Sequence, residues 1–143
     1  MKKCTSNLQA RRAGQTRWLY RQEAQTFAFN RWANAERSMG FLRKIAIRVW
    51  RTHGNGKRMP AITAGRGTPH GHSLASYCIG FTVIVLARHH RTILVLLHEL
   101  THALGPCQHG PRFVKTYFPL LQKYAGYNRI FLQQVAGNRG IMI

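Results

Sequence analysis

The stretch that most constrains this chain spans residues 94–109 and reads LVLLHELTHALGPCQH. It contains HELTH, in which His98 and His102 are four residues apart and Glu99 follows the first histidine. Residues four apart lie on one face of an α-helix, so both imidazoles can bind one metal ion. Glu99 would then reach the open side of that ion, where it can take a proton from a water molecule. In a shuffled chain of this composition the pattern would arise about once in a hundred times.

The residues around HELTH predict the helix that this pattern requires. No residue at 92–97 is charged, and the dipeptide at 105–106 is Gly-Pro, which is typical of a helix end. Four apolar residues recur at helical spacing: Ile93, Leu97, Leu100 and Leu104. The helix is therefore expected to end shortly after His102, where the chain turns back.

A third metal ligand is expected just after this turn. His109 follows His102 by seven residues, and Pro111 then suits the first turn of another helix. Three histidines would leave a fourth position on Zn²⁺ for water. Cys107 is an alternative third ligand, and its other interpretation is a small buried residue of the turn. The alternative to a metal site as a whole is a buried group of hydrogen-bonded histidines.

The run LLHELTHAL followed by HGPRFV resembles the SprT-like and related small zinc metallohydrolases of the zincin type, including small enzymes of bacteria and phages. The resemblance is closest over 88–121. It implies His98, His102 and His109 as zinc ligands, Glu99 as the general base, and peptidase activity on proteins associated with nucleic acid. The metzincin pattern fits less well, because it would need a histidine where this chain has Gln108. SprT-like proteins often carry a C-terminal zinc ribbon, but this sequence has no CxxC.

The charge of the chain is extreme. There are 22 Lys and Arg against three acidic residues, which gives a formal net charge of +19. Such a chain should attract a polyanion, most simply nucleic acid, although an anionic lipid surface or a solvated face are alternatives. The candidate nucleic-acid contacts are Arg11, Arg12, Arg17, Arg21, Lys57 and Arg58.

The cysteines and the first residues favour a cytoplasmic protein. Three cysteines, at 4, 78 and 107, have no framework spacing, so reduced thiols are expected. The start MKKCTSNLQARRAG lacks the apolar segment of a secretory signal; an organellar transit peptide is the alternative interpretation of this basic start. The longest apolar run, 77–87, is too short to span a bilayer.

The predicted fold is α+β, of the zincin-like metallopeptidase class: a basic flexible tail at 1–14 and a single domain at 15–143. It would have an N-terminal helix, a short twisted sheet, the HExxH helix and C-terminal helices. The N-terminal helix is expected over 15–39, with a buried apolar stripe of Tyr20, Ala24, Ala28, Trp32, Ala35 and Met39.

Alternation predicts a half-buried strand at 45–50, and a short strand is expected at 61–64. The apolar run 74–87 predicts one strand covered on both faces. A helix is expected from Pro111, with Pro119 kinking or ending it, and another over 128–136. The aromatic and apolar residues expected to pack inward from the first of these are Phe113, Val114, Tyr117 and Phe118.

Further residues are candidates for supporting roles. A zinc-bound histidine donates its second N–H to a carboxylate or a carbonyl. Glu23 and Glu36 are the only candidate carboxylates besides Glu99, but backbone carbonyls are favoured, with Glu23 paired to an arginine. Three tyrosines (Tyr117, Tyr124 and Tyr127) could donate to a reaction oxyanion, or could be core or surface aromatics. Four other histidines are expected to be loop or surface residues: His70, His72, His89 and His90.

The sequence therefore predicts a zinc-dependent hydrolase, most simply a metallopeptidase with protein or peptide substrates. A metal-dependent hydrolase with another substrate class is one alternative. A basic nucleic-acid-binding protein with a structural metal site is another. A protease of proteins bound to nucleic acid would combine the motif and the charge.

Overall fold

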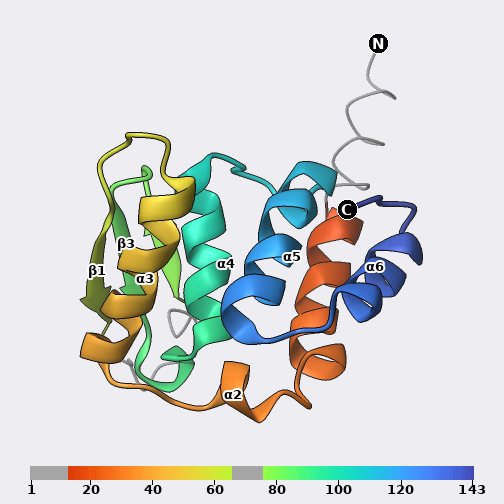
Figure 1. The fold of residues 1–143 in the computed structure, drawn as a ribbon, viewed down its shortest axis with the longest axis horizontal. Coiled ribbons are helices and arrows are strands. Elements are labelled where there is room, and N and C mark those ends of the chain that lie inside the picture. The colour runs from red at the N-terminus through yellow and green to blue at the C-terminus, as the bar shows by residue number, and fades with distance from the viewer. Residues whose placement is uncertain (1–12, 66–75) are drawn as a thin grey trace.

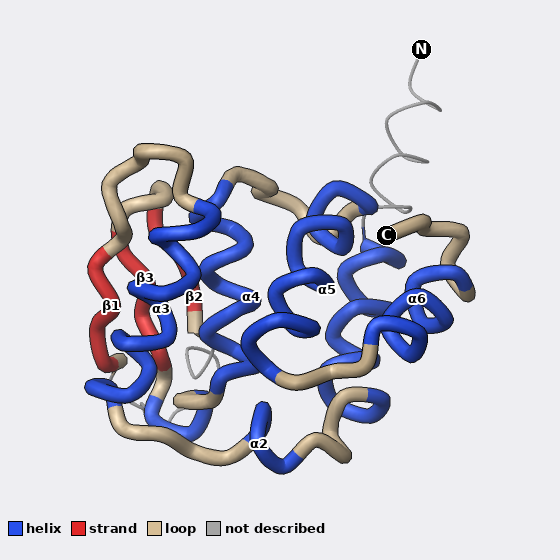
Figure 2. The backbone as a smooth tube through the Cα atoms, in the orientation of Figure 1, coloured by secondary structure: helices blue, strands red, loops and turns tan. Residues whose placement is uncertain are grey.

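The computed structural model describes residues 13–65 and 76–143. Within them the chain forms an α+β fold, so the predicted class is confirmed, while the zincin-like architecture stays a prediction (Figures 1 and 2). A first helix occupies 13–21. It is followed by η1 (Gln22–Thr26), α2 (Arg31–Asn34), α3 (Met39–His53), β1 (Ala61–Ala64), β2 (Tyr77–Ile79), β3 (Val83–Leu86), η2 (Arg88–His90), α4 (Ile93–Leu104), α5 (Pro111–Ala125) and α6 (Arg129–Gly137).

The HELTH helix, α4, lies at the centre of the molecule (Figure 1). It packs against α2, α3, α5 and the strands β2 and β3, and nine of its twelve residues are buried. Its start is fixed by Thr92, whose hydroxyl accepts a hydrogen bond from the Val95 N–H. It ends at Gly105, whose φ of 142° is one that L side chains rarely adopt. The helix predicted around the motif is therefore confirmed.

The sheet has three strands in the order β1-β3-β2, with β1 parallel and β2 antiparallel to β3. Strand β1 confirms the prediction at 61–64. The single strand predicted at 74–87 is wrong, because Gly80 and Phe81 interrupt it with φ values of 51° and 63°. Two successive residues with positive φ make the tight turn that joins antiparallel strands, and Thr82 N–H donates to Ile79 C=O across it.

Among the described residues only one face of the sheet is fully buried, which corrects the expectation of two covered faces. Residues of β3 alternate between partly buried and buried, and β1 buries only Ile62. Ile79 of β2 is 52% exposed. A hairpin with one solvated face is common in antiparallel pairs, whereas a parallel strand between helices would be covered on both sides.

The strand predicted at 45–50 is wrong, because these residues belong to helix α3. Its buried residues follow helical and not alternating spacing: Leu42, Ile45, Ala46, Val49 and Trp50. Ser38 caps this helix by accepting a hydrogen bond from the Phe41 N–H. Ile47, which the alternating pattern placed beside Ile45 and Val49, is 37% exposed.

The continuous helix predicted at 15–39 is also wrong. The first helix passes into the π-helical turn η1 and ends at Phe27, and Asn30 then caps the short helix α2. Asn34 closes the break by donating from its side-chain amide to the carbonyls of Phe27 and Asn30. The predicted stripe is not the buried one, since Tyr20 and Trp32 are about half exposed. The residues buried instead are Leu19, Phe27 and Ala33.

The C-terminal helices follow the prediction except at Pro119. Helix α5 begins at Pro111 and ends at Gly126, which adopts a left-handed φ of 76°. The four side chains predicted to face inward from it are all buried. Pro119 neither kinks nor ends the helix, which continues to Ala125. Pro119 is exposed, as is Lys115 four residues before it, so the carbonyl that loses its helical partner lies on the solvent side. Helix α6, capped by Asn128, confirms the prediction at 128–136.

The structure describes only part of the tail expected at 1–14 and only some of the histidines expected in loops. Residues 1–12 lie outside the description, whereas 13 and 14 already belong to the first helix. The predicted loop histidines His70 and His72 also lie outside it, while His89 and His90 are exposed in η2, as expected. Across the described ranges, every helix is too short or too polar to cross a membrane.

Candidate metal centre

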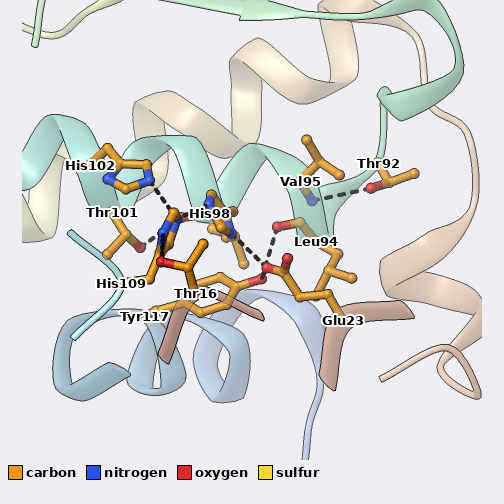
Figure 3. A network of polar contacts seen from close by, with 11 residues as sticks. Thr16, Glu23, Thr92, Leu94, Val95, His98, Thr101, His102, His109 and Tyr117 are labelled. Carbon is orange, nitrogen blue, oxygen red and sulfur yellow. Dashed lines mark hydrogen bonds and ion pairs between the residues drawn. The ribbon is translucent and has the colours of Figure 1, made fainter. Parts of the chain in front are cut away.

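Three histidines meet where the end of α4 faces the start of α5 (Figure 3). The Nε2 atom of His109 lies 2.9 Å from Nε2 of His98 and 3.0 Å from Nε2 of His102. Helix α4 presents the first two histidines on one face, and the turn after Gly105 brings the third back to them. The structure therefore brings together all three residues that the sequence predicted as ligands.

The second nitrogen of each imidazole has its own partner. Nδ1 of His98 lies 2.6 Å from the Glu23 carboxylate, and Nδ1 of His102 lies 2.9 Å from the Pro106 carbonyl. Nδ1 of His109 is 3.4 Å from the Thr16 hydroxyl. Carbonyl and carboxylate oxygens only accept, so the first two imidazoles carry their hydrogen on Nδ1. In the unprotonated state that metal binding requires, the Nε2 atoms of both rings carry lone pairs directed at His109.

This arrangement fits a metal ion. A single hydrogen on His109 Nε2 cannot make a linear hydrogen bond to two lone pairs, whereas one cation between the nitrogens would satisfy all three. Zn–N bonds of about 2.0–2.1 Å at tetrahedral angles separate ligand nitrogens by about 3.3 Å, a few tenths more than the distances here. All three possible ligand atoms lie within 4.8 Å of one another. Three histidines could thus bind a metal, and the donor set suits zinc.

A buried aromatic ring supports the triad. The Phe113 ring, which is fully buried, has its centroid 5.0 Å from that of His98, 4.7 Å from that of His102 and 4.9 Å from that of His109. Phe113 belongs to the HGPRF segment, so the segment that supplies the third histidine also supplies this apolar support. An apolar shell of this kind limits solvent access to a metal site.

Cys107 is not part of the triad in this structure. Its thiol is exposed and contacts the Gly105 carbonyl at 3.6 Å. Neither interpretation from the sequence holds, because Cys107 is neither buried in the turn nor grouped with the three histidines. It lines the cleft beside them, together with Cys78 of β2.

Glu23 is the main correction to the site drawn from the sequence. The sequence favours backbone carbonyls as partners of the histidines; this prediction is confirmed for His102, which contacts the Pro106 carbonyl, and is wrong for His98, which contacts the Glu23 carboxylate. Oε1 of Glu23 accepts from His98 Nδ1 and also, at 2.8 Å, from the buried Tyr117 hydroxyl. Glu23 lies in the π-helical turn η1, a feature often found at functional sites. Two acceptor contacts on one oxygen hold the carboxylate against His98, which orients that ring.

Replacing Glu23 by glutamine is expected to weaken zinc binding by about 10–100-fold. An amide carries less negative charge on its oxygen and holds the His98 imidazole less firmly. The dissociation constant can be measured by competition with a chromophoric chelator. Glu36 gives a matched control, because it is exposed in the same part of the chain. Equal zinc affinity in Glu23→Gln and the wild type would mean that Glu23 has no part in metal binding.

The electrostatics of the site keep two of the ligands neutral. Burial, followed by the nearby His98 and His102, lowers the pKa of His109 to about 3. Burial is also the main cause that lowers the pKa of His102. Burial alone would lower the pKa of His98. The charge and hydrogen bond of the Glu23 carboxylate have the larger effect, so the pKa of His98 is raised. Metal binding requires an unprotonated nitrogen, and at neutral pH two of the three rings already provide it.

Glu99 lies at the floor of an open cleft over the triad. The cleft has a volume of about 470 Å³, and its walls are the first helix, the β2–β3 hairpin and the turn after α4. Glu99 is 6% exposed, and burial raises the pKa of its carboxyl group, partly offset by His98. A carboxylate with a raised pKa is a better base near neutral pH than an ordinary one. The residues lining the cleft are Tyr20, Ser76, Cys78, Gly80, Phe81, His98, Glu99, His102, Cys107 and His109.

The tyrosine at this cleft is not one that the sequence indicated. Tyr117 donates to Glu23 and to the Leu94 carbonyl, and Tyr127 donates to the Phe27 carbonyl. Tyr124 is buried beside His53, on the far part of α5. Tyr20 instead lines the cleft, because the first helix turns it outward. Its spacing of three residues from Glu23 on a helix was the signal available in the sequence.

The four predicted nucleic-acid contacts that the structure describes do not form one group. Arg17 and Arg21 are exposed on the first helix, while Lys57 and Arg58 are exposed in the loop after α3. These two segments lie on either side of α4 (Figure 1). The Lys57 ammonium donates to the Leu104 carbonyl at the end of α4, a typical place for a cation. Arg11 and Arg12 lie outside the described residues.

Comparison of the chain with protein-family models, with curated proteins and with solved structures finds no match. The resemblance to SprT-like enzymes therefore rests on the motif residues alone.

Proposed function

We propose that this protein is a zinc-dependent hydrolase, and more specifically a metallopeptidase. The observation that carries the proposal is that three imidazole Nε2 atoms converge at one end of α4 with Glu99 beside them in an open cleft. A structural zinc site is closed by four protein ligands, whereas a catalytic site has three and keeps one position free. Among residues 13–65 and 76–143 the possible ligand group has three histidines, and Cys107 is turned to the Gly105 carbonyl.

In this proposal the residues of the cleft have distinct roles. Bound zinc would supply Lewis acidity to the substrate carbonyl and to a water molecule. Glu99 accepts a proton from the attacking water and delivers it to the nitrogen of the leaving amine. Glu23 holds His98 in the orientation that directs its Nε2 into the site. The burial that raises the pKa of Glu99 favours the first of these transfers, because it makes the carboxylate a stronger proton acceptor.

A peptide is the substrate class that the walls of the cleft favour. Strand β2 is at the edge of the described sheet, with β3 on one side only. Ser76 and Cys78, in and next to this strand, line the cleft. An extended peptide can pair with the backbone of an edge strand, which gives binding that is independent of most side chains. Phosphodiesters and small amides have no such means of pairing with the edge strand.

The net charge of +19 supports a second element of the proposal, that the substrate proteins are associated with nucleic acid. A polycation binds nucleic acid through phosphate neutralisation, with a strong dependence on salt. This proposal agrees with what the SprT-like resemblance implies. A basic nucleic-acid-binding protein with a structural metal site is the competing function favoured by the same charge.

The test is hydrolysis by the zinc-loaded protein of a nucleic-acid-binding protein substrate, with and without DNA, and of RNA in parallel. We expect protein cleavage that rises several-fold when DNA is added at low salt and loses this increase at high salt, because the phosphate contacts are screened. A zinc chelator should stop cleavage, and added zinc should restore it.

Each other result selects a competing function. Cleavage of RNA but not of protein would assign the site to another hydrolase class. Nucleic-acid binding with no hydrolysis of any substrate would make the protein a binding module. Protein cleavage that DNA leaves unchanged would keep the peptidase and remove its link to nucleic acid.

A further inference from the structure

The cleft over the triad continues beyond Glu99 along α4. A second hollow of about 590 Å³ extends toward the start of this helix, where Thr92 and the histidines of η2 line it. The two hollows share four residues, which are Tyr20, Ser76, His98 and Glu99. A substrate that occupied both would therefore pass between the first helix and the hairpin at the level of Glu99. Tyr20 is the residue that the first helix contributes at this point.

The Tyr20 ring is held over the ligands. It stacks on the His98 imidazole, with centroids 5.7 Å apart and planes 13° apart. It is tilted against the His109 imidazole, with centroids 5.2 Å apart. At the same time Tyr20 is 51% exposed, so it is not a core residue. A large aromatic side chain that contacts two ligand rings and faces the cleft can meet a bound substrate.

The other described tyrosine side chains cannot serve the site. The hydroxyls of Tyr117 and Tyr127 already donate to protein oxygens, and Tyr124 is buried away from the cleft. Backbone amides of α4 near Glu99 are used within the helix, so they cannot donate to a substrate either. A phenol is neutral at physiological pH and donates one hydrogen bond, which suits an oxygen that becomes negative.

We propose that Tyr20 is a catalytic residue of this hydrolysis, whose hydroxyl donates a hydrogen bond to the carbonyl oxygen of the scissile amide. The inference rests on the proposed function. When the oxygen of water bonds to the carbonyl carbon, the electron pair of the C=O π bond moves to the carbonyl oxygen. The Tyr20 hydrogen bond stabilises the charge on that oxygen, and the hydrogen remains on the phenol. When the C–N bond breaks, that pair returns to form the C=O bond of the new carboxyl group, while the C–N pair leaves on the nitrogen, which takes the proton held by Glu99.

Three variants of the full zinc-loaded chain test this role. Tyr20→Phe keeps the ring on His98 and removes only the hydroxyl, whereas Tyr20→Leu removes both. Tyr124→Phe is the matched control, because it removes a buried hydroxyl that has no hydrogen-bond partner among the described residues. The readouts are zinc content, kcat and KM on a peptide substrate, and the Kd of a peptide phosphonamidate, whose tetrahedral oxygens resemble the charged intermediate.

We expect Tyr20→Phe to lower kcat by about 10²–10³-fold, with KM changed less than threefold and zinc content unchanged. The Kd of the phosphonamidate should rise at least tenfold. Tyr124→Phe should match the wild type in all readouts. Wild-type kcat and phosphonamidate affinity in Tyr20→Phe would overturn the proposal. Loss of zinc in Tyr20→Phe would also overturn it, by making Tyr20 a positioning residue of the ligands.

The two proposals can fail separately. If the wild type cleaves peptides and Tyr20→Phe does so equally well, only the role of Tyr20 is lost. If the phosphonamidate binds in a Tyr20-dependent way but no substrate is hydrolysed, the proposed function fails while the hydroxyl contact remains. A wild-type protein that binds zinc but not the phosphonamidate contradicts the Tyr20 contact directly.

Discussion

Replacement of Glu99 by glutamine should lower kcat by about 10²–10⁴-fold and leave zinc binding intact. Glutamine has the size of glutamate but no basic oxygen, so the proton of the attacking water has no acceptor. Glu99 is also the only acidic residue among the described residues that line the cleft, so no neighbouring carboxylate can take its place. The measurement is steady-state hydrolysis of a peptide by protein whose zinc content has been verified by elemental analysis.

Two results would decide against this role. A fully active Glu99→Gln protein would show that Glu99 is not the base. A Glu99→Gln protein without zinc would show that the carboxylate contributes to the metal site, because no histidine has been changed. Glu36→Gln, at an exposed acidic residue, should behave as the wild type in both measurements.

Replacement of His102 by alanine should remove bound zinc from the dialysed protein. The loss of one of three ligands is expected to lower zinc affinity by more than about a hundredfold, since even changes to residues behind the ligands lower it by about 10–100-fold. Elemental analysis after extensive dialysis should find about one zinc per wild-type chain and none in His102→Ala.

His90→Ala is the matched control for this experiment, because it makes the same change at an exposed histidine of η2. It should keep its zinc. Circular dichroism should show the same helix content in both variants, which would separate loss of a ligand from loss of the fold. Absence of zinc from the wild type, even after zinc is offered, would contradict the metal centre. The three histidines would then be a hydrogen-bonded group in a basic nucleic-acid-binding protein.

The elements predicted correctly are those whose signals are local. Helix α4 has its cap, its apolar spacing and its terminal Gly105 within fourteen residues of sequence. Helix α5 has Pro111 at its start and Gly126 at its end, and α6 has its Asn128 cap. Each of these residues acts on the backbone within one turn of its own position, so no distant part of the chain is needed to interpret it.

The errors arose where two local interpretations compete. Six residues at 45–50 fit an alternating pattern, but the wider set from Leu42 to Trp50 fits a helix, and packing of that face on α4 decided between them. The run 74–87 has no charged residue and no Asn, Asp or Pro, so only Gly80 indicates the turn that it makes with Phe81. Phe81 adopts a positive φ, which is rare for an aromatic residue and is not predictable from its type.

The sequence by itself determined the helix α4, the face on which His98, Glu99 and His102 lie, and the return of the chain at Gly105. These follow from the period of the α-helix and from residues that fix single backbone angles. Only the tertiary structure decided the partners that come from the N-terminal part: Glu23 against His98, Thr16 near His109, and Tyr20 over both rings. These contacts join residues 75 to 93 positions apart. These contacts form because the first helix packs against α5 and ends at Phe27. The free energy of such packing is spread over many side chains, so no short stretch of sequence reveals it.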